Sequence, residues 1–241
     1  MDFTQLIILQ LIAHLLADYS FQSDAKAVEK NEKGFKSNFL KWHILIVFIS
    51  SWILSFQVKF IIASFIIALT HWIIDGFKPK FLKSKWFGKY AFFIDQILHI
   101  SILITISYFF YHNINSITSI TIPTKITASI LAFLILGKPT NIVIKEIFRI
   151  YTITLEKAKN ELLNAGKLIG TIERWLILIF IILEQYEAIG FLIAAKSILR
   201  YSPKTENTEF NKTEYVLIGT MLSFFIAIII GISYSKILLN L

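Results

Sequence analysis

Three aspartates of the chain each lie four residues from a histidine, inside stretches that are otherwise apolar. The pairs are His14 with Asp18, His71 with Asp75, and Asp95 with His99. A spacing of four places two side chains on one face of a helix, one turn apart. Ionisable groups inside a membrane span cost free energy and usually mark a functional site. The three pairs therefore predict a centre that binds a metal ion or handles protons.

The types of donor atom favour a metal. Imidazole nitrogens and carboxylate oxygens suit zinc, manganese and iron, and a bound imidazole often has a carboxylate on its second nitrogen. We expect a divalent metal, with zinc first and manganese or iron as alternatives. The absence of cysteine from the sequence excludes thiolate ligands and a cysteine nucleophile.

The composition indicates a membrane protein. Of the 241 residues, 56% are hydrophobic and only 17% are charged, against roughly 25% charged residues in soluble domains. The net charge of +8 comes from lysines concentrated in particular loops. This clustering indicates membrane topology, and we expect no nucleic-acid partner. We also expect the first apolar run to be a retained span, because no small-residue cleavage site follows it.

Seven apolar stretches approach the ~20 residues that cross a bilayer core. We therefore expect an all-α, polytopic helix bundle. The division we predict is a four-span domain over residues 1–112 and a carboxyl-terminal extension over 113–241, with an amphipathic cytoplasmic segment at 145–167. The predicted spans are 3–19, 41–57, 60–76, 90–111, 126–144, 173–199 and 214–238.

Two details of the last spans are open to test. The sixth span contains Glu184 and Glu187 near its middle, so it is either one helix or two half-helices joined near Gln185. The seventh has small residues at four-residue spacing, which predicts a close-packing face. These small residues are Gly219, Ser223, Ala227 and Gly231.

Lysine placement predicts the orientation. The loops over residues 20–41 and 78–89 are rich in lysine, whereas the 112–125 loop carries only Lys125. By the positive-inside rule, the first two loops are cytoplasmic and the amino terminus is outside. All three pairs, together with His43, then fall in one layer near the inner leaflet. A high content of Ile, Lys, Phe and Asn favours a bacterial source, hence a bacterial cytoplasmic membrane.

Roles can be assigned to these side chains as expectations. The metal ligands are expected to be His14, Asp18, His71, Asp75, Asp95 and His99. The catalytic groups are expected to be Asp18, Asp75, Asp95 and His43. A spare aspartate would be the general base, and His43 would be a ligand or the acid on the leaving group.

A second set of polar residues is expected to bind the substrate. These residues are Gln22, Lys78, Gln96, Glu173, Arg174 and Lys196. For the last three, a buried structural ion-pair network is an equal alternative. His112 lies in an expected external loop, and we interpret it as an ordinary surface residue.

The amino-terminal half resembles a known family. The residues that carry the resemblance are His14-Leu-Leu-Ala-Asp18-Tyr-Ser-Phe-Gln22, His43, His71-Trp-Ile-Ile-Asp75-Gly-Phe-Lys78 and Asp95-Gln96-Ile-Leu-His99. They look like the bacterial and phage membrane proteins grouped as domain of unknown function 3307, over about residues 5–110. The family has no assigned activity, so the resemblance implies a membrane fold and a shared site. The same helices are loosely similar to predicted membrane-bound metal-dependent hydrolases.

The function we expect is metal-dependent hydrolysis of a lipid or other amphipathic substrate at the inner leaflet. The main alternative is a divalent-cation or proton transporter or channel that uses the same residues. Ligation of haem by two histidines and a non-catalytic membrane protein remain open as further alternatives. The membrane lipid is the expected partner, and the sequence does not predict an oligomeric state.

Overall fold

The computed structural model describes residues 2–84, 87–114, 122–153, 160–199 and 207–239. Within these ranges the regular elements are all helices, which confirms the all-α class. Among the described residues, five helical segments are long and apolar enough to cross a membrane, and a sixth is added if the bent pair Asp24–Lys36 and Asn38–Leu54 is one span. The protein is therefore a helical bundle of the membrane type. It divides into two compact units, Met1–Leu131 and Ala132–Leu241, which we describe separately.

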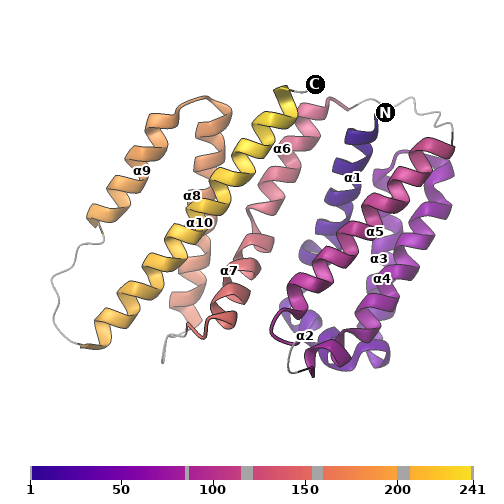
Figure 1. Cartoon of the computed structure of the whole chain (residues 1–241), viewed down its shortest axis with the longest axis horizontal. Helices are drawn as coiled ribbons and strands as arrows, with labels where there is room; N and C mark the ends of the chain where they lie inside the picture. Colours follow the sequence, from indigo (N-terminus) through magenta and orange to yellow (C-terminus); the bar gives the residue numbers. More distant parts are fainter. Residues whose placement is uncertain (1, 85–86, 115–121, 154–159, 200–206, 240–241) are drawn as a thin grey trace. The chain divides into compact units, whose positions relative to one another are not determined.

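Four helices form the bundle of the first unit (Figure 1). They are α1 (Phe3–Leu15), α3 (Asn38–Leu54), α4 (Ile61–Leu82) and α5 (Ala91–Asn113). Helix α1 packs against α3 and α5, α3 packs against α4, and α4 packs against α5, so the four helices close a ring. Buried apolar side chains, among them Leu6, Phe60 and Phe110, fill the end of the ring that lies near the amino terminus.

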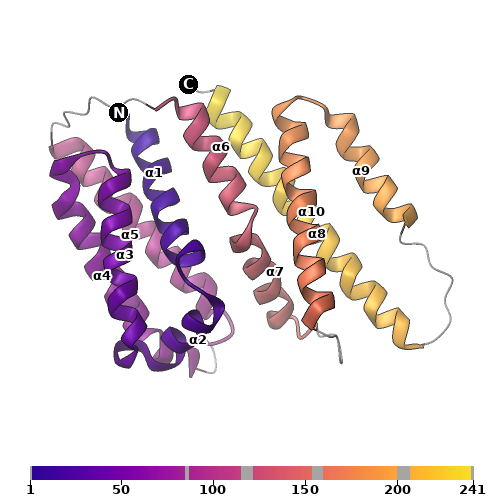
Figure 2. The same cartoon turned by 180° about the vertical axis from the view of Figure 1, so that it is seen from behind.

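A short helix, α2 (Asp24–Lys33), lies at the opposite end of this bundle (Figures 1 and 2). Its amino terminus is capped by Ser23, whose hydroxyl accepts from the backbone N–H of Lys26. A hydrogen bond from the Lys26 ammonium lowers the pKa of the Glu29 carboxyl on the exposed side of α2. The helix is thus capped and charged on its outer face, while its inner face turns toward the bundle.

Two glycines let α2 approach α4 closely. Gly34 ends α2 with φ +52°, and a β-carbon there would lie 2.4 Å from the carbonyl oxygen of Gly76. A β-carbon on Gly76 would lie 2.1 Å from the ring of Phe35. Only glycine fits both positions, because any side chain would push the two segments apart. We call Gly34, Phe35 and Gly76 the glycine clamp.

Helix α1 ends in an unusual turn. It continues into one π-helical turn, η1 (Leu16–Ser20), in which the N–H of Phe21 donates to the carbonyl of Leu16 at 2.8 Å. A π turn rotates the residues that follow relative to α-helical spacing, and such turns are frequent at functional sites. Asp18 lies inside this turn and is buried.

The second unit contains α7 (Lys138–Ile150), α8 (Asn160–Ile182), α9 (Tyr186–Leu199) and α10 (Asn207–Leu239). The boundary between the units falls within α6 (Thr124–Ile135). Helix α10 packs against α8 and α7. The predicted close-packing face is confirmed: a β-carbon on Gly231 would lie 2.2 Å from Ile181, and one on Gly219 would lie 3.3 Å from Phe148.

Three predicted segments are each divided between two helices. The stretch 126–144 lies within one candidate span, Thr124–Ile150, which a turn at Leu136 and Gly137 divides into α6 and α7. The sixth predicted span is two helices joined beside Gln185, which is one of its two predicted alternatives. These helices, α8 and α9, run in opposite directions on either side of a turn at Glu184, φ +57° (Figure 1). The segment 145–167 is shared between the end of α7 and the start of α8, and its residues 154–159 lie outside the described ranges.

Candidate metal centre

The seven histidines and aspartates singled out in the first unit come together at the end of the bundle that carries α2. Each has less than a tenth of its surface exposed. The exposed fractions are 6% for His14, 9% for Asp18, 0% for His43, 3% for His71, 1% for Asp75, 4% for Asp95 and 5% for His99. Four helical segments, α1 with η1, α3, α4 and α5, supply them. We call this set the His/Asp cluster.

The middle of the His/Asp cluster is formed by His43 and His71. Their Nε2 atoms are 3.1 Å apart. Asp18 Oδ1 lies 3.3 Å from each of these nitrogens, and Asp75 Oδ2 lies 3.5 Å from His43 Nε2 and 3.3 Å from His71 Nε2. Ligands bound at about 2.0–2.1 Å to a small cation are separated by distances of this order.

Three overlapping groups of side chains have ligand atoms within 4.8 Å of one another. They are His14, Asp18 and His71; His43, His71 and Asp75; and Asp75, Asp95 and His99. Because His71 and Asp75 each belong to two groups, the groups adjoin. The arrangement has enough donors for one ion with supporting carboxylates, or for two ions that share ligands.

Asp95 and His99 form the side of the cluster contributed by α5. Asp95 Oδ2 accepts from Lys78 Nζ at 2.7 Å and from Gln96 Nε2 at 3.1 Å. His99 Nδ1 is 3.9 Å from the same oxygen, which is too long for a hydrogen bond. The ring of His99 stacks on that of His71, with centroids 3.8 Å apart and planes 15° apart. Stacked rings lie in nearly parallel planes, and His71 and His99 belong to different groups of candidate ligands among the described residues.

Gln96 connects α5 to α1. Its side-chain oxygen accepts from the hydroxyl of Tyr19 at 2.9 Å and lies 3.3 Å from His14 Nε2. Gln96 thus orients His14 and Asp95 from outside the centre. Tyr19, which is buried, was not predicted as a site residue, although it directly follows Asp18 in the sequence.

Lys30, which sequence reasoning treated only as part of a positive loop, belongs to the site. It is 2% exposed and donates to Asp75 Oδ2 at 2.8 Å. The glycine clamp holds α2 where this contact is possible. Within the cluster, three carboxylates face the ammonium groups of Lys30 and Lys78, so with neutral imidazoles one negative charge remains in excess. A buried site with this balance favours a cation.

Several buried polar atoms of the cluster have no hydrogen-bond partner among the described residues. These atoms are Asp75 Oδ1, Asp95 Oδ1, His43 Nδ1 and both ring nitrogens of His99. Buried polar groups in native proteins are nearly always paired, so each exception requires a water, an ion or a ligand. Together with the donor types, these atoms fit a divalent metal centre.

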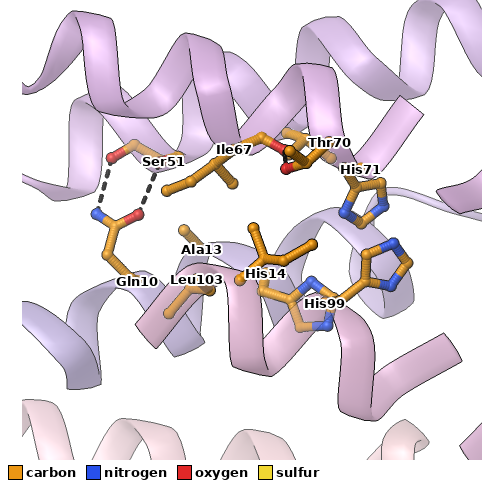
Figure 3. A pocket seen from close by; sticks show the side chains of 11 residues that line it. Gln10, Ala13, His14, Ser51, Ile67, Thr70, His71, His99 and Leu103 are labelled. Carbon is orange, nitrogen blue, oxygen red and sulfur yellow. Dashed lines mark hydrogen bonds between the residues drawn. The ribbon is translucent and has the colours of Figure 1, made fainter. Parts of the chain in front are cut away.

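A small cavity adjoins the cluster on the side toward the middle of the bundle (Figure 3). The space in which the centre of a water molecule can lie is about 20 Å³, so the cavity has room for one water. His14, His71 and His99 line one end. At the other end, Ser51 Oγ donates to Gln10 Oε1 at 2.7 Å and Gln10 Nε2 donates to the carbonyl of Ser51 at 3.0 Å.

The predicted substrate-binding residues are divided between the units. In the first unit Gln22 is buried, and Lys78 and Gln96 are engaged with Asp95. In the second unit Glu173 and Lys196 form an ion pair between α8 and α9. A role of these residues in binding substrate stays a prediction.

Arg174, also predicted to bind substrate, has its donors occupied inside the second unit. It is 1% exposed, and it donates to the carbonyls of Leu136 and Gly137. Its other acceptors are Ser223 at 2.9 Å, Asn141 at 2.8 Å and Thr171 at 3.0 Å. The two carbonyls lie at the break between α6 and α7, where helical partners are missing. These contacts favour the structural alternative for Arg174.

The fold and the site define a class: a helical membrane protein with a buried histidine–aspartate centre at one end of a four-helix bundle. Residues 6–128 match the family described as protein of unknown function (DUF3307). The chain therefore belongs to the DUF3307 family. No curated protein and no solved structure matches the chain.

Proposed function

We propose that the protein is a membrane-embedded, metal-dependent hydrolase that acts on a lipid or another amphipathic substrate. The observation that carries this proposal is the group of unpartnered, buried imidazole and carboxylate atoms in the His/Asp cluster. With neutral imidazoles the cluster has one excess negative charge, and some of its donor atoms have no partner among the described residues, which suits a divalent cation. Zinc fits these donors first, and manganese and iron are alternatives.

The side chains best placed to hold the ion are those of His43, His71, Asp18 and Asp75. Their imidazole nitrogens lie 3.1 Å apart, and each nitrogen lies 3.3–3.5 Å from a carboxylate oxygen of Asp18 and of Asp75. A divalent ion supplies Lewis acidity, which makes water a nucleophile near neutral pH and polarises an ester or amide. Lys30 limits the charge on Asp75, and Gln96 orients His14. The remaining carboxylate, Asp95, is available to accept a proton from the attacking water.

The proposed topology places the His/Asp cluster at the cytoplasmic side of a bacterial inner membrane, with the amino terminus outside. The positive-inside rule supports this, since α2 and the α4–α5 connection carry the lysines at the cluster end. The reversal between α8 and α9 changes the sequence-based count of seven spans. If α9 returns toward the side where α8 began, Lys196 lies on the cytoplasmic side, as the rule requires.

The metal content of the detergent-purified protein, measured by elemental mass spectrometry, tests the proposal. The wild type is expected to contain one or two equivalents of zinc, manganese or iron, and a His71→Ala/Asp75→Ala variant is expected to lose them while it stays helical. His112→Ala is the matched control, because His112 is an exposed histidine on α5 outside the cluster. Absence of metal from the wild type, after purification without chelator and addition of metal, would reject a metal-dependent activity.

A divalent-cation or proton transporter is the second candidate. The contacts between Gln10, Ser51 and Ser64 favour it, since they continue the polar interior beyond the cluster. Against it, Leu6, Phe60 and Phe110 fill the amino-terminal end of the bundle with apolar side chains. The two candidates can be distinguished in vesicles that contain the protein and an internal pH or metal indicator. A transporter predicts a flux of protons or metal ions that depends on His71, and the hydrolase predicts no such flux.

A further inference from the structure

The cavity beside the His/Asp cluster is exposed along one seam of the bundle. Nine of its eleven lining side chains are buried, and the two partly exposed ones are Thr70 and Ile102. Thr70 lies on α4 and Ile102 lies on α5, and these two helices pack against each other. We call the gap between these two side chains the α4–α5 rim.

The other sides of the cavity are closed by buried side chains. The lining residues of α1 and α3 are all buried, including Ala13 and Val47. At the cluster end, Lys30 and α2 cover Asp75. Among the described residues that line the cavity, the α4–α5 rim is therefore the route by which a ligand can enter from outside the bundle.

The rim lies away from both ends of α4 and α5, and the proposed spanning of the membrane by these helices places it beside the hydrocarbon. Thr70 is about 14 Å along α4 from its first residue, at 1.5 Å per residue, and both helices qualify as spans. Nearby exposed side chains on α4 are apolar, among them Ile66, Leu69 and Ile73. The Thr70 hydroxyl donates to backbone carbonyls of its own helix at 2.9 Å. The rim thus presents a surface that suits an acyl chain.

The cavity lining has apolar and polar parts close together. Ile67 lies one turn from Thr70, and Leu103 follows Ile102. His71 and His99 line the adjoining end, and the ring nitrogens of His99 have no hydrogen-bond partner among the described residues (Figure 3). A ligand that fits these surfaces has a hydrocarbon part that ends at the rim. It also has a hydrogen-bonding group just inside the rim. The junction between an acyl chain and its ester or amide carbonyl has that chemistry.

We propose that the α4–α5 rim is a lateral entry site for a membrane acyl lipid, whose carbonyl group reaches His71 and His99 while its chain stays in the bilayer. The ≈ 20 Å³ cavity takes a group of the size of a water, so only the carbonyl oxygen enters, and the acyl chain and the rest of the lipid stay outside. The inference deepens the proposed hydrolase and depends on it for the reaction, but not for the binding of the lipid.

Photo-crosslinking tests this site. The full-length protein is placed in bilayer nanodiscs that contain a phospholipid with a diazirine near the ester carbonyl of one acyl chain, and adducts are mapped by mass spectrometry. Adducts are expected on Leu103 and Ile67, which are 3% and 6% exposed and so are out of reach of lipid that only surrounds the protein. An Ile102→Trp variant, which fills the rim, is expected to reduce these adducts at least five-fold.

Ile104→Trp is the matched control, since Ile104 lies on the same helix and is 41% exposed outside the cavity. It is expected to leave the adducts on Leu103 and Ile67 unchanged. If Ile102→Trp does not fold, Ile102→Phe supplies a smaller obstruction with the same expected direction. Adducts confined to outward-facing positions, or cavity adducts that persist in a folded rim variant, would overturn the inference.

Metal content measured on the same samples separates this inference from the proposed function. Wild-type protein that binds metal but gives no cavity adducts rejects lipid entry and leaves the metal centre standing. Cavity adducts in a protein that binds no metal support the lipid site and reject the hydrolase. The rim variants are expected to keep the wild-type metal content, because neither Thr70 nor Ile102 contributes to the His/Asp cluster.

Discussion

At the scale of single residues, the Lys30–Asp75 ion pair decides what the cluster can bind. Both side chains are almost fully buried, and Lys30 Nζ is 2.8 Å from the Asp75 oxygen that also faces His43 and His71. Removal of one partner from a buried ion pair leaves an uncompensated charge. A divalent ion at the cluster would approach the same oxygen, so Lys30 and the ion compete for the charge of Asp75.

Lys30→Met is therefore expected to have opposite effects on the metal-free and metal-bound protein. It keeps a long apolar stem and removes the ammonium, which should destabilise the metal-free protein by about 3 kcal/mol. The affinity for the divalent ion should increase about ten-fold, because the competing cation is gone. Thermal unfolding with and without metal, and metal titration by calorimetry, measure the two effects.

Lys33→Met is the control for this change, since the side chain of Lys33 is 58% exposed and pairs at 3.9 Å with Glu29, which is outside the cluster. It is expected to change stability by less than about 1 kcal/mol. Weaker metal binding by Lys30→Met than by the wild type would show that Lys30 supports the ion instead of competing with it.

At the scale of elements, α2 closes the cluster end of the bundle, and the glycine clamp fixes its position. The approach of Gly34 and Phe35 to Gly76 explains why glycine directly follows Asp75. Without this approach, Lys30 could not reach Asp75 from a helix that lies across the bundle end. The clamp is thus the link between the short α2 and the electrostatics of the site.

Gly76→Ala is expected to destabilise the protein by about 1–3 kcal/mol, because its new methyl group overlaps the Phe35 ring. Combining it with Phe35→Leu should recover part of the loss, which a double-mutant cycle of thermal unfolding detects. Gly166→Ala, in α8, is the control: a β-carbon there meets nothing within 4 Å, so this change should be neutral or slightly stabilising. Equal losses from both substitutions would contradict the clamp.

The side chains of the His/Asp cluster could be predicted from the sequence, because each histidine–aspartate pair is recognisable from its spacing of four residues. Helical spacing brought His71 within 3.3 Å of Asp75, and alternation of the spans placed α1, α3, α4 and α5 residues at one end. Lys30 was missed because its partner is 45 residues away and the contact depends on the packing of α2. The π turn at Asp18 was also missed, since it has no distinctive local pattern. The break beside Gln185 was predicted as one of two alternatives, because Glu184 and Glu187 interrupt the apolar run, but the reversal of direction was not.

At the scale of the whole molecule, the candidate chemistry belongs to one unit. The family match over residues 6–128 nearly coincides with the first unit, Met1–Leu131, and the complete His/Asp cluster lies within it. The second unit has a different polar feature, the buried guanidinium of Arg174, whose contacts join the α6–α7 break to α8 and α10. We infer that this unit contributes stability or binding surface, and that the metal centre does not depend on it.

Arg174→Met is accordingly expected to lower stability without changing metal content. It leaves the Leu136 carbonyl and the Asn141 side chain without their donor, at a cost of about 3 kcal/mol in the free energy of unfolding.

Arg149→Met is the control for this change. It removes a 46% exposed side chain paired with Glu146, and its effect on the free energy of unfolding should stay below about 1 kcal/mol. Thermal unfolding followed by circular dichroism measures stability, and elemental analysis of the folded fraction measures the metal. Loss of metal from folded Arg174→Met, with Arg149→Met unaffected, would show that the centre needs the second unit, because no Arg174 contact lies within the His/Asp cluster.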